Sequence, residues 1–185
     1  MTEIISKKEF LQNKKSYLKR LELGAIFIYP TDTIYGIGCI CSNKKSIQKI
    51  RKIKQRTAKP FSIIVPTKNW IKKNCKYRKD LDKHLKKLPG KYTLILELKN
   101  KKLSPNKDLN TIGVRIPKHW ISRIVKEINM PIITTSVNIS NEPYMTSLKN
   151  INPKIKKEVA LIIYEGQLNN KPSKVINLVT NRRIR

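Results

Sequence analysis

Short apolar runs alternate with helical patterns along the whole chain, and this alternation constrains the fold more than any other feature. The runs "AIFIY", "FSIIV", "YTLILEL" and "PIITT" have the length of buried strands. Between them lie stretches with apolar residues at helical spacing, for example Ile47, Ile50 and Ile53. Because strands and helices interleave without a repeat or a linker, we expect a single layered α/β or α+β domain over residues 1–185, built on one twisted sheet.

Capping residues, glycine and proline positions and local composition predict where the helices, strands and loops begin and end. A helix is predicted over 7–23, with Gly24 as its stop, and a second over 46–56. Thr67 is expected to cap a short helix. The composition of 99–110 is typical of a mobile, solvated loop. The other predicted elements are a helix near 81–88 ended by Pro89 and Gly90, a helix over 119–128, a helix near 147–157, and strands at 111–117, 159–166 and 174–179.

The chain is strongly basic, with 41 Lys and Arg against 12 Asp and Glu and a formal net charge of +29. Such a field attracts phosphate, nucleotide or RNA. An alternative is compositional, because lysine outnumbers arginine and accompanies abundant Ile and Asn, as in proteins from AT-rich genomes. The sequence contains no RGG run and no zinc-finger spacing. A dedicated nucleic-acid-binding role is therefore disfavoured, although direct contact of the basic surface with RNA stays open.

Several classes of protein are excluded or disfavoured. No apolar run is long enough to span a membrane, and the first residues are charged, so we expect a soluble, cytoplasmic protein. The three cysteines include no C-x-x-C pair and are expected to be reduced core residues. His84 and His119 lie far apart in the sequence and suggest neither a metal pair nor a triad. No Walker-type or G-x-G-x-x-G nucleotide cradle is present.

Four strands end in, or lead into, polar or basic segments: "PTDTIYG", "KQRTAKP", "GVRIP" and "TSVNIS". Loops that leave strand ends near one another form sites in layered sheets, so we expect these segments to share one cleft. Guanidinium groups grip phosphate oxygens through paired bonds and lysine acts as a point charge, which suits a polyphosphate ligand. The candidate cations are Lys54, Arg56, Lys59 and Arg115, and the candidate neutral donors are Thr31, Thr33, Ser136, Asn138 and Ser140.

Each candidate also has an ordinary structural explanation. Lys54 and Arg56 end a basic helix and would complement its dipole. Asp32 would shape a turn. Ser136 and Asn138 would cap the next turn, and Arg115 would lie exposed on an edge strand.

Taken together, the ordered stretches "YPTDTIYGIGC", "KQR" with "KPFSIIV", "PGKYTLIL", "GVRIPKH", "TTSVNIS" and "PSKVINLV" resemble the YrdC/TsaC-like threonylcarbamoyl-adenylate synthases over about residues 21–179. The resemblance implies a mixed, twisted sheet flanked by helices around a basic concave cavity. It implies a nucleotidyltransferase that joins L-threonine, bicarbonate or CO2, and ATP with Mg2+ into threonylcarbamoyl-AMP, releasing pyrophosphate. A downstream tRNA threonylcarbamoyltransferase machinery would then modify the adenosine beside the anticodon.

The resemblance also implies roles for individual residues. Lys54 and Arg56 would contact nucleotide phosphates and the threonine carboxylate and serve as the catalytic pair. The expected threonine-binding residues are Thr31, Thr33, Tyr35 and Arg115, and the expected ATP-binding residues are Lys54, Arg56, Ser136, Asn138, Ser173 and Arg183, with Arg182 and Arg185 as alternatives to Arg183. No protein metal ligand is predicted.

The sequence departs from the family pattern in three places. The "KQRTAKP" loop is one residue shorter than the commoner spacing, so Lys59 is not assigned to the usual lysine position of the family. The tail "NRRIR" lacks the usual arginine followed by glycine, and the second domain of longer relatives is not expected here. Two rival functions remain: a non-catalytic RNA-binding protein, and the carbamoyltransferase chemistry of hydrogenase maturation, which is disfavoured because the similar domain there is part of a much larger protein.

Overall fold

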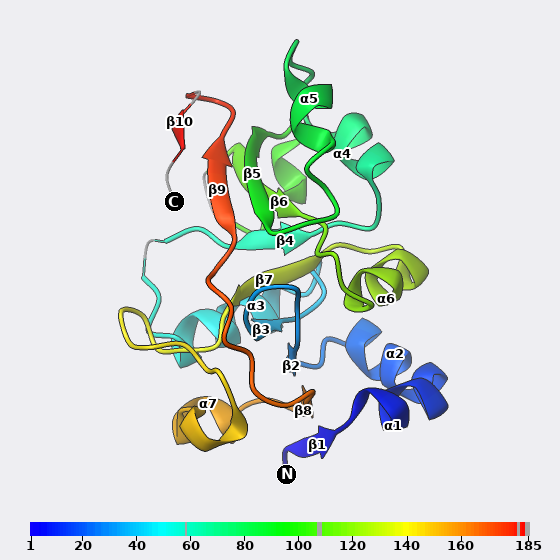
Figure 1. Ribbon diagram of the computed structural model, residues 1–185, viewed down its shortest axis with the longest axis vertical. Coiled ribbons are helices and arrows are strands. Elements are labelled where there is room, and N and C mark those ends of the chain that lie inside the picture. Colours follow the sequence, from blue (N-terminus) through cyan, green and yellow to red (C-terminus); the bar gives the residue numbers. More distant parts are fainter. Residues whose placement is uncertain (58, 107–108, 181, 184–185) are drawn as a thin grey trace.

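The computed structural model describes residues 1–57, 59–106, 109–180 and the backbone of 182–183, and these residues form a mixed sheet with helices on both faces (Figure 1). The strands lie in the order β1-β8-β2-β3-β7-β4-β6-β5-β9-β10. Their bounds are Glu3–Ile5 (β1), Phe27–Tyr29 (β2), Gly36–Gly38 (β3), Ser62–Ile64 (β4), Tyr92–Glu97 (β5), Thr111–Arg115 (β6), Ile132–Ser136 (β7), Leu161–Ile163 (β8), Lys174–Asn177 (β9) and Arg182–Arg183 (β10).

The helices cover the sheet in three groups, and each group has its own apolar cluster. α3 (Lys44–Ile53) and α7 (Pro153–Lys156) share one cluster. α1 (Lys7–Gln12), α2 (Lys14–Glu22) and α6 (Ile121–Ile128) share the second, and α4 (Lys68–Asn74) and α5 (Leu81–Leu85) the third.

Successive side chains of a buried strand point to opposite faces of the sheet. On β2, Ile28 packs into the cluster of α3 and α7, while Phe27 and Tyr29 pack into that of α1, α2 and α6. The predicted mixed sheet flanked by helices is therefore confirmed.

Local chemistry explains where the observed helices differ from those expected. The predicted helix over 7–23 is two helices that meet at Asn13, and Gly24 follows with a left-handed φ of 94°. The predicted helix near 147–157 is replaced by a 3-10 turn (Leu148–Asn150) and the short α7. Here Pro153 takes the first helical position and Asn152 caps it, so the helix begins anew. Thr67 caps α4 as predicted, because its side chain accepts from the Trp70 N–H.

Most of the described residues of the segment 99–110 are exposed, as expected for a solvated loop, but the segment is attached to the sheet at one point. It contains a 3-10 turn (Lys101–Leu103), and the Asn106 side chain is buried. The Asn106 amide accepts from the Phe61 N–H at 2.6 Å and donates to the Phe61 carbonyl at 2.9 Å. Asn106 thus acts as a strand partner for the residue that precedes β4.

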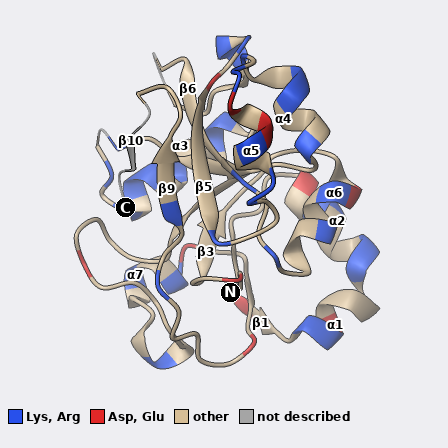
Figure 2. Ribbon diagram, turned by 45° about the horizontal axis from the view of Figure 1, so that its top comes forward, with Lys and Arg blue, Asp and Glu red and all other residues tan. Residues whose placement is uncertain are grey.

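The basic residues are distributed over the surface. Figure 2 shows Lys and Arg on helices around the sheet, including α1, α2, α4, α5 and α6. This distribution fits the compositional explanation of the net charge better than a single nucleic-acid face. Within the described part of the chain, no helix combines the length and the apolar character that crossing a bilayer requires.

Candidate functional site

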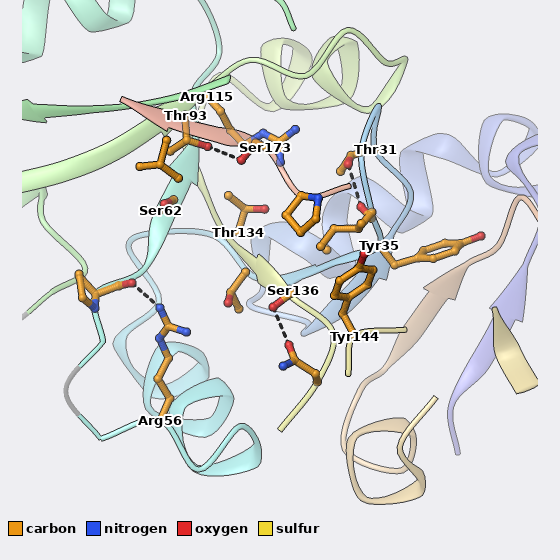
Figure 3. Close-up of a pocket in the computed structure, with 17 residues that line it drawn as sticks. Thr31, Tyr35, Arg56, Ser62, Thr93, Arg115, Thr134, Ser136, Tyr144 and Ser173 are labelled. Atoms are coloured by element: carbon orange, nitrogen blue, oxygen red, sulfur yellow. Dashed lines mark hydrogen bonds between the residues drawn. The ribbon is translucent and has the colours of Figure 1, made fainter. Parts of the chain in front are cut away.

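A cavity of about 380 Å³ opens over the middle of the sheet (Figure 3). It collects residues from six separate parts of the chain, and its lining contains two arginines and, among the described residues, no carboxylate. The predicted site residues in the lining are Thr31, Tyr35, Arg56, Arg115, Ser136, Asn138 and Ser173. The sequence segments expected to meet in one cleft therefore do so.

Lys54 lies behind the cavity wall, and not in its lining, which differs from its expected direct contact with ligand. Its side chain is buried, and Nζ donates to the carbonyl oxygens of Ser136 and Asn138, both at 2.6 Å, and to Asn138 Oδ1 at 3.2 Å. The Lys54 carbonyl accepts from the N–H and the hydroxyl of Ser140, both at 2.9 Å. Burial, followed by the nearby charge of Arg56, lowers the pKa of Lys54 to about 7. Lys54 therefore joins the end of α3 to the loop after β7.

Gln55 turns the chain so that Lys54 and Arg56 point to different places. It adopts a left-handed φ of 47° just beyond the helix end. The Gln55 N–H donates to the Lys52 carbonyl and the Arg56 N–H to the Arg51 carbonyl, the bond pattern of a Schellman motif. Lys54 enters the wall and Arg56 reaches the cavity lining.

Arg56 is held by its own loop. Its Nε donates to the Lys59 carbonyl at 2.7 Å and its Nη2 to the Pro60 carbonyl at 2.6 Å. Burial and the Arg51 charge lower the pKa of Arg56 to about 10, so the group stays protonated at neutral pH. Lys59 does not line the cavity, and its Nζ donates to Asn141 Oδ1.

Arg115 is buried, and not exposed on an edge strand, because β6 lies between β4 and β5. Its Nη2 donates to Asp32 Oδ1 at 2.7 Å and to Thr33 Oγ1 at 3.3 Å. Asp32 also accepts from the Lys118 N–H at 2.8 Å. Asp32 thus does more than shape a turn, because it holds the cation that lines the cavity.

The two threonines of the "PTDT" turn largely satisfy each other. Thr31 Oγ1 lies 2.9 Å from Thr33 Oγ1 and donates to the Ile34 carbonyl at 2.7 Å. Thr33 is fully buried and does not line the cavity, which differs from its expected place in the threonine pocket. Its hydroxyl instead supports Arg115. The polar side chains of this loop therefore mainly hydrogen-bond to one another and to Arg115, and so fix the structure of the site.

Tyr35 lines the cavity, but its hydroxyl points to another segment. It donates to the Gly166 carbonyl at 2.7 Å and accepts from the Glu165 N–H at 3.0 Å. Its ring stacks on Tyr164, with 5.8 Å between ring centroids. Burial raises the pKa of Tyr35 to about 12. The ring is left as the part of Tyr35 that can face a ligand.

The remaining predicted residues lie on two walls. Ser136 Oγ donates to Asn138 Oδ1 in the loop after β7. Ser173 precedes β9, and its Oγ lies 2.8 Å from Thr93 Oγ1 on β5. Arg183 lies in β10, but its side chain is outside the described residues, as are residues 181 and 184–185. Its contact with nucleotide stays a prediction.

Sequence reasoning missed the hydroxyl groups on the cavity floor: Ser62 of β4, Thr93 of β5 and Thr134 of β7. Ser62 pairs with Thr134 and with Gly113 in register, so their side-chain positions share one face of the sheet. One signal was present in the sequence, because Thr134 and Ser136 are two residues apart in a strand and so face the same way.

The polar groups that line the cavity suit a metal ion that enters bound to a ligand better than a metal ion held permanently by the protein. Among the residues that the structure describes, no group of three His, Cys, Asp or Glu side chains could hold a metal ion. Mg2+ takes oxygen ligands and usually keeps waters and substrate phosphates in its shell. Ser136 and Asn138 supply neutral oxygens that fit such a shell.

Fold and site together define a class of α+β protein with an arginine-bearing, hydroxyl-rich cavity over a mixed sheet. The chain belongs to the Sua5/YciO/YrdC family, whose model, described as "Telomere recombination", matches residues 19–185.

Two relatives with curated names are similar over most of the chain. A protein of Methanocaldococcus jannaschii, provisionally named as a threonylcarbamoyl-AMP synthase, is 39% identical over 86% of this chain and 77% of its own length. The threonylcarbamoyl-AMP synthase of Vibrio campbellii is 25% identical over 95% of this chain and 99% of its own.

Two solved structures show the same fold. E. coli YciO matches with a TM-score of 0.85 and 24% identity, over 100% of this chain and 95% of the YciO chain. P. abyssi Sua5 complexed with L-threonine matches with a TM-score of 0.81 and 24% identity, over 97% of this chain. The present chain spans 54% of the length of that Sua5 chain.

Proposed function

We propose that the protein is a threonylcarbamoyl-AMP synthase that uses L-threonine, bicarbonate or CO2, and ATP, and releases pyrophosphate. The observation that carries this proposal is the single cavity in which Arg56, Arg115 and the Ser136–Asn138 loop meet. The names of the relatives and the L-threonine complex of P. abyssi Sua5 support it. The product would be consumed by a tRNA threonylcarbamoyltransferase, the reaction class that needs an activated carbamoyl donor.

The end of the cavity near Arg115 suits the amino acid. A guanidinium forms paired hydrogen bonds with a carboxylate, and the buried position of Arg115 strengthens them. The Tyr35 ring and Thr31 also line the cavity, and a small side chain would lie against them. We therefore assign threonine to this end, with its carboxylate on Arg115.

The end near Arg56 suits the triphosphate. The threonine amine takes up CO2 as a carbamate, whose oxygen attacks the α-phosphorus while the bond to pyrophosphate breaks. The reaction brings two anions together, so positioning and charge neutralisation supply most of the catalysis. Arg56 would neutralise phosphate oxygens, and Ser136 and Asn138 would hydrogen-bond to them. Lys54 would position this loop from behind.

Mg2+ bound to ATP would neutralise charge on the phosphate oxygens. Ser136 and Asn138 would supply neutral oxygens to its coordination shell. Because Ser136 Oγ bonds to Asn138 Oδ1, binding the ion here would exchange that contact for contacts with the ion or its waters.

The proposal is tested by incubating the protein with Mg-ATP, bicarbonate and L-threonine and detecting threonylcarbamoyl-AMP by mass spectrometry. Product should require all three substrates, and pyrophosphate should appear with it. Arg56→Ala and Arg115→Ala should each lower turnover by about 10²–10³-fold, the usual effect of losing one transition-state contact. Arg123→Ala, which changes an exposed arginine on α6, is the matched control. Pyrophosphate release that does not depend on threonine would refute the assignment.

A non-catalytic RNA-binding role is the second candidate, and the net charge favours it. Thermal shift separates the two. Stabilisation by L-threonine and by Mg-ATP, each at a concentration well above its Kd, supports the synthase, whereas stabilisation by RNA alone supports the rival.

A further inference from the structure

Residues 164–173 form a crossing segment that joins β8 to β9. These two strands lie near opposite ends of the sheet, so the segment must pass over the strands between them. In Figure 1 it is the orange trace that rises from β8 to β9. Its last residues, Pro172 and Ser173, line the cavity. The position of this segment therefore affects the shape of the site.

Glu165 attaches the start of the crossing segment to the turn that follows β6. Its Oε1 accepts from Trp120 Nε1 at 2.7 Å, and its Oε2 lies 3.0 Å from His119 Nε2. His119 Nδ1 accepts from the Ile121 N–H at 3.4 Å, which leaves the proton on Nε2 to be donated to Glu165. Both carboxylate oxygens are thus engaged by donors from one turn.

The same part of the crossing segment is bound to Tyr35. The Glu165 N–H donates to the Tyr35 hydroxyl, which in turn donates to the Gly166 carbonyl. A phenol hydroxyl has one proton, and this bond uses it. The orientation of the Tyr35 ring, which lines the cavity, is therefore tied to the backbone at Glu165.

The turn that holds Glu165 also leads to the second cavity residue at this end. Lys118, next to His119, donates its N–H to Asp32, and Asp32 accepts from Arg115. A continuous series of contacts therefore runs from Arg115 through Asp32 and the 117–120 turn to Glu165 and on to Tyr35. Arg115 and Tyr35 both line the cavity, so the series closes around its amino-acid end.

We propose that Glu165 is a positioning residue for this end of the cavity, which sets the place of Tyr35 relative to Arg115. This inference rests on the proposed function only in assigning the amino acid to that end. A carboxylate accepts from two N–H donors at once, whereas a glutamine side chain offers one oxygen and turns its NH2 group toward the other donor. Glu165→Gln should therefore loosen the attachment while keeping the size of the side chain.

The test compares the full-length wild type with Glu165→Gln and with Glu158→Gln, a matched change in an exposed ion pair with Lys49. Hydrogen exchange without ligands should be faster over 164–168 in Glu165→Gln and unchanged in Glu158→Gln. The KM for threonine should rise about tenfold, with the KM for ATP within twofold of wild type. Trp120→Phe, which keeps an aromatic ring and removes one donor, should shift both readouts in the same direction by a smaller factor.

The outcomes separate the two proposals. Hydrogen exchange over 164–168 at the wild-type rate in Glu165→Gln, or an equal rise in the KM values for threonine and ATP, would overturn the positioning role. A wild type that makes no threonine-dependent product would refute the proposed function. Hydrogen exchange would then still decide whether Glu165 holds the segment at Tyr35.

Discussion

The ammonium of Lys54 lies 2.6 Å from the carbonyl oxygen of Ser136, 82 residues further along the chain. Two more oxygens, both from Asn138, complete its contacts. A lysine at the end of a helix thus holds the backbone of the loop that carries Ser136 and Asn138 into the cavity. Lys54 therefore supports the cavity wall without lining the cavity, whereas Arg56 lines it.

Lys54→Met should destabilise the protein by about 2–4 kcal/mol, because it leaves buried carbonyl groups without a donor. Urea unfolding measures the change. Lys49→Met is the matched control, since Lys49 belongs to the same helix and forms an exposed ion pair. It should change stability by less than about 1 kcal/mol. Equal effects of the two substitutions would show that the Lys54 contacts contribute no more than a surface pair.

The lowered pKa of Lys54 predicts a pH dependence of stability. The pKa is about 7 in the folded protein against 10.5 for an ordinary lysine. Between these values the unfolded chain binds more protons than the folded one, so the free energy of unfolding rises with pH, by at most about 1.4 kcal/mol per unit. Below pH 7 the contribution levels off.

Comparison of wild type with Lys54→Met between pH 7 and 10 isolates this contribution. The wild type should gain stability relative to the variant as the pH rises. Parallel curves would mean that the three oxygen acceptors keep Lys54 protonated in the fold throughout this range.

Asp32→Asn should destabilise the protein by about 3–5 kcal/mol, because it removes the negative charge that pairs with the buried guanidinium of Arg115. Both side chains are under 10% exposed, at 7% for Arg115 and 6% for Asp32. Asp82→Asn, in an exposed pair with Lys72, is the control and should cost at most about 1 kcal/mol. Denaturant unfolding of both variants measures the difference, and equal losses would argue against a buried pair.

Local pattern made most of the fold predictable, because helix and strand periodicity depends on near neighbours. The cavity floor was less accessible to prediction. Ser62, Thr93 and Thr134 meet only because β4, β5 and β7 take particular places and registers in the sheet, which no local signal specifies. Burial of Arg115 likewise follows from the central position of β6. Residue type identified the chemistry of the site, whereas tertiary contacts determined which groups face the cavity.

Gln55→Gly should stabilise the protein by about 0.5–1 kcal/mol, because glycine adopts a left-handed conformation without the steric cost of a side chain. For a chain of this size, that corresponds to a rise in Tm of about 1–4 °C. Gln48→Gly, at an exposed position inside α3, should instead destabilise by about 1 kcal/mol. A lower Tm for Gln55→Gly would show that the Gln55 side chain has a compensating contact.

Gly113→Ala should lower both stability and catalytic activity, although the substitution adds only one methyl group. A Cβ at this position would lie 2.5 Å from Ser62 Oγ and 3.1 Å from Thr93 Cγ2, so at least one cavity-floor side chain must move. We expect a loss of about 1–3 kcal/mol in stability, typical of overpacking, and at least about a tenfold fall in kcat/KM, or about 1.4 kcal/mol of transition-state stabilisation. Adding Ser62→Ala removes the oxygen that the Cβ meets most closely. The double variant should recover most of the lost stability, measured by thermal unfolding, but not the lost turnover, because the Ser62 hydroxyl is missing from the floor. Full recovery of turnover would show that this hydroxyl plays no part in ligand binding.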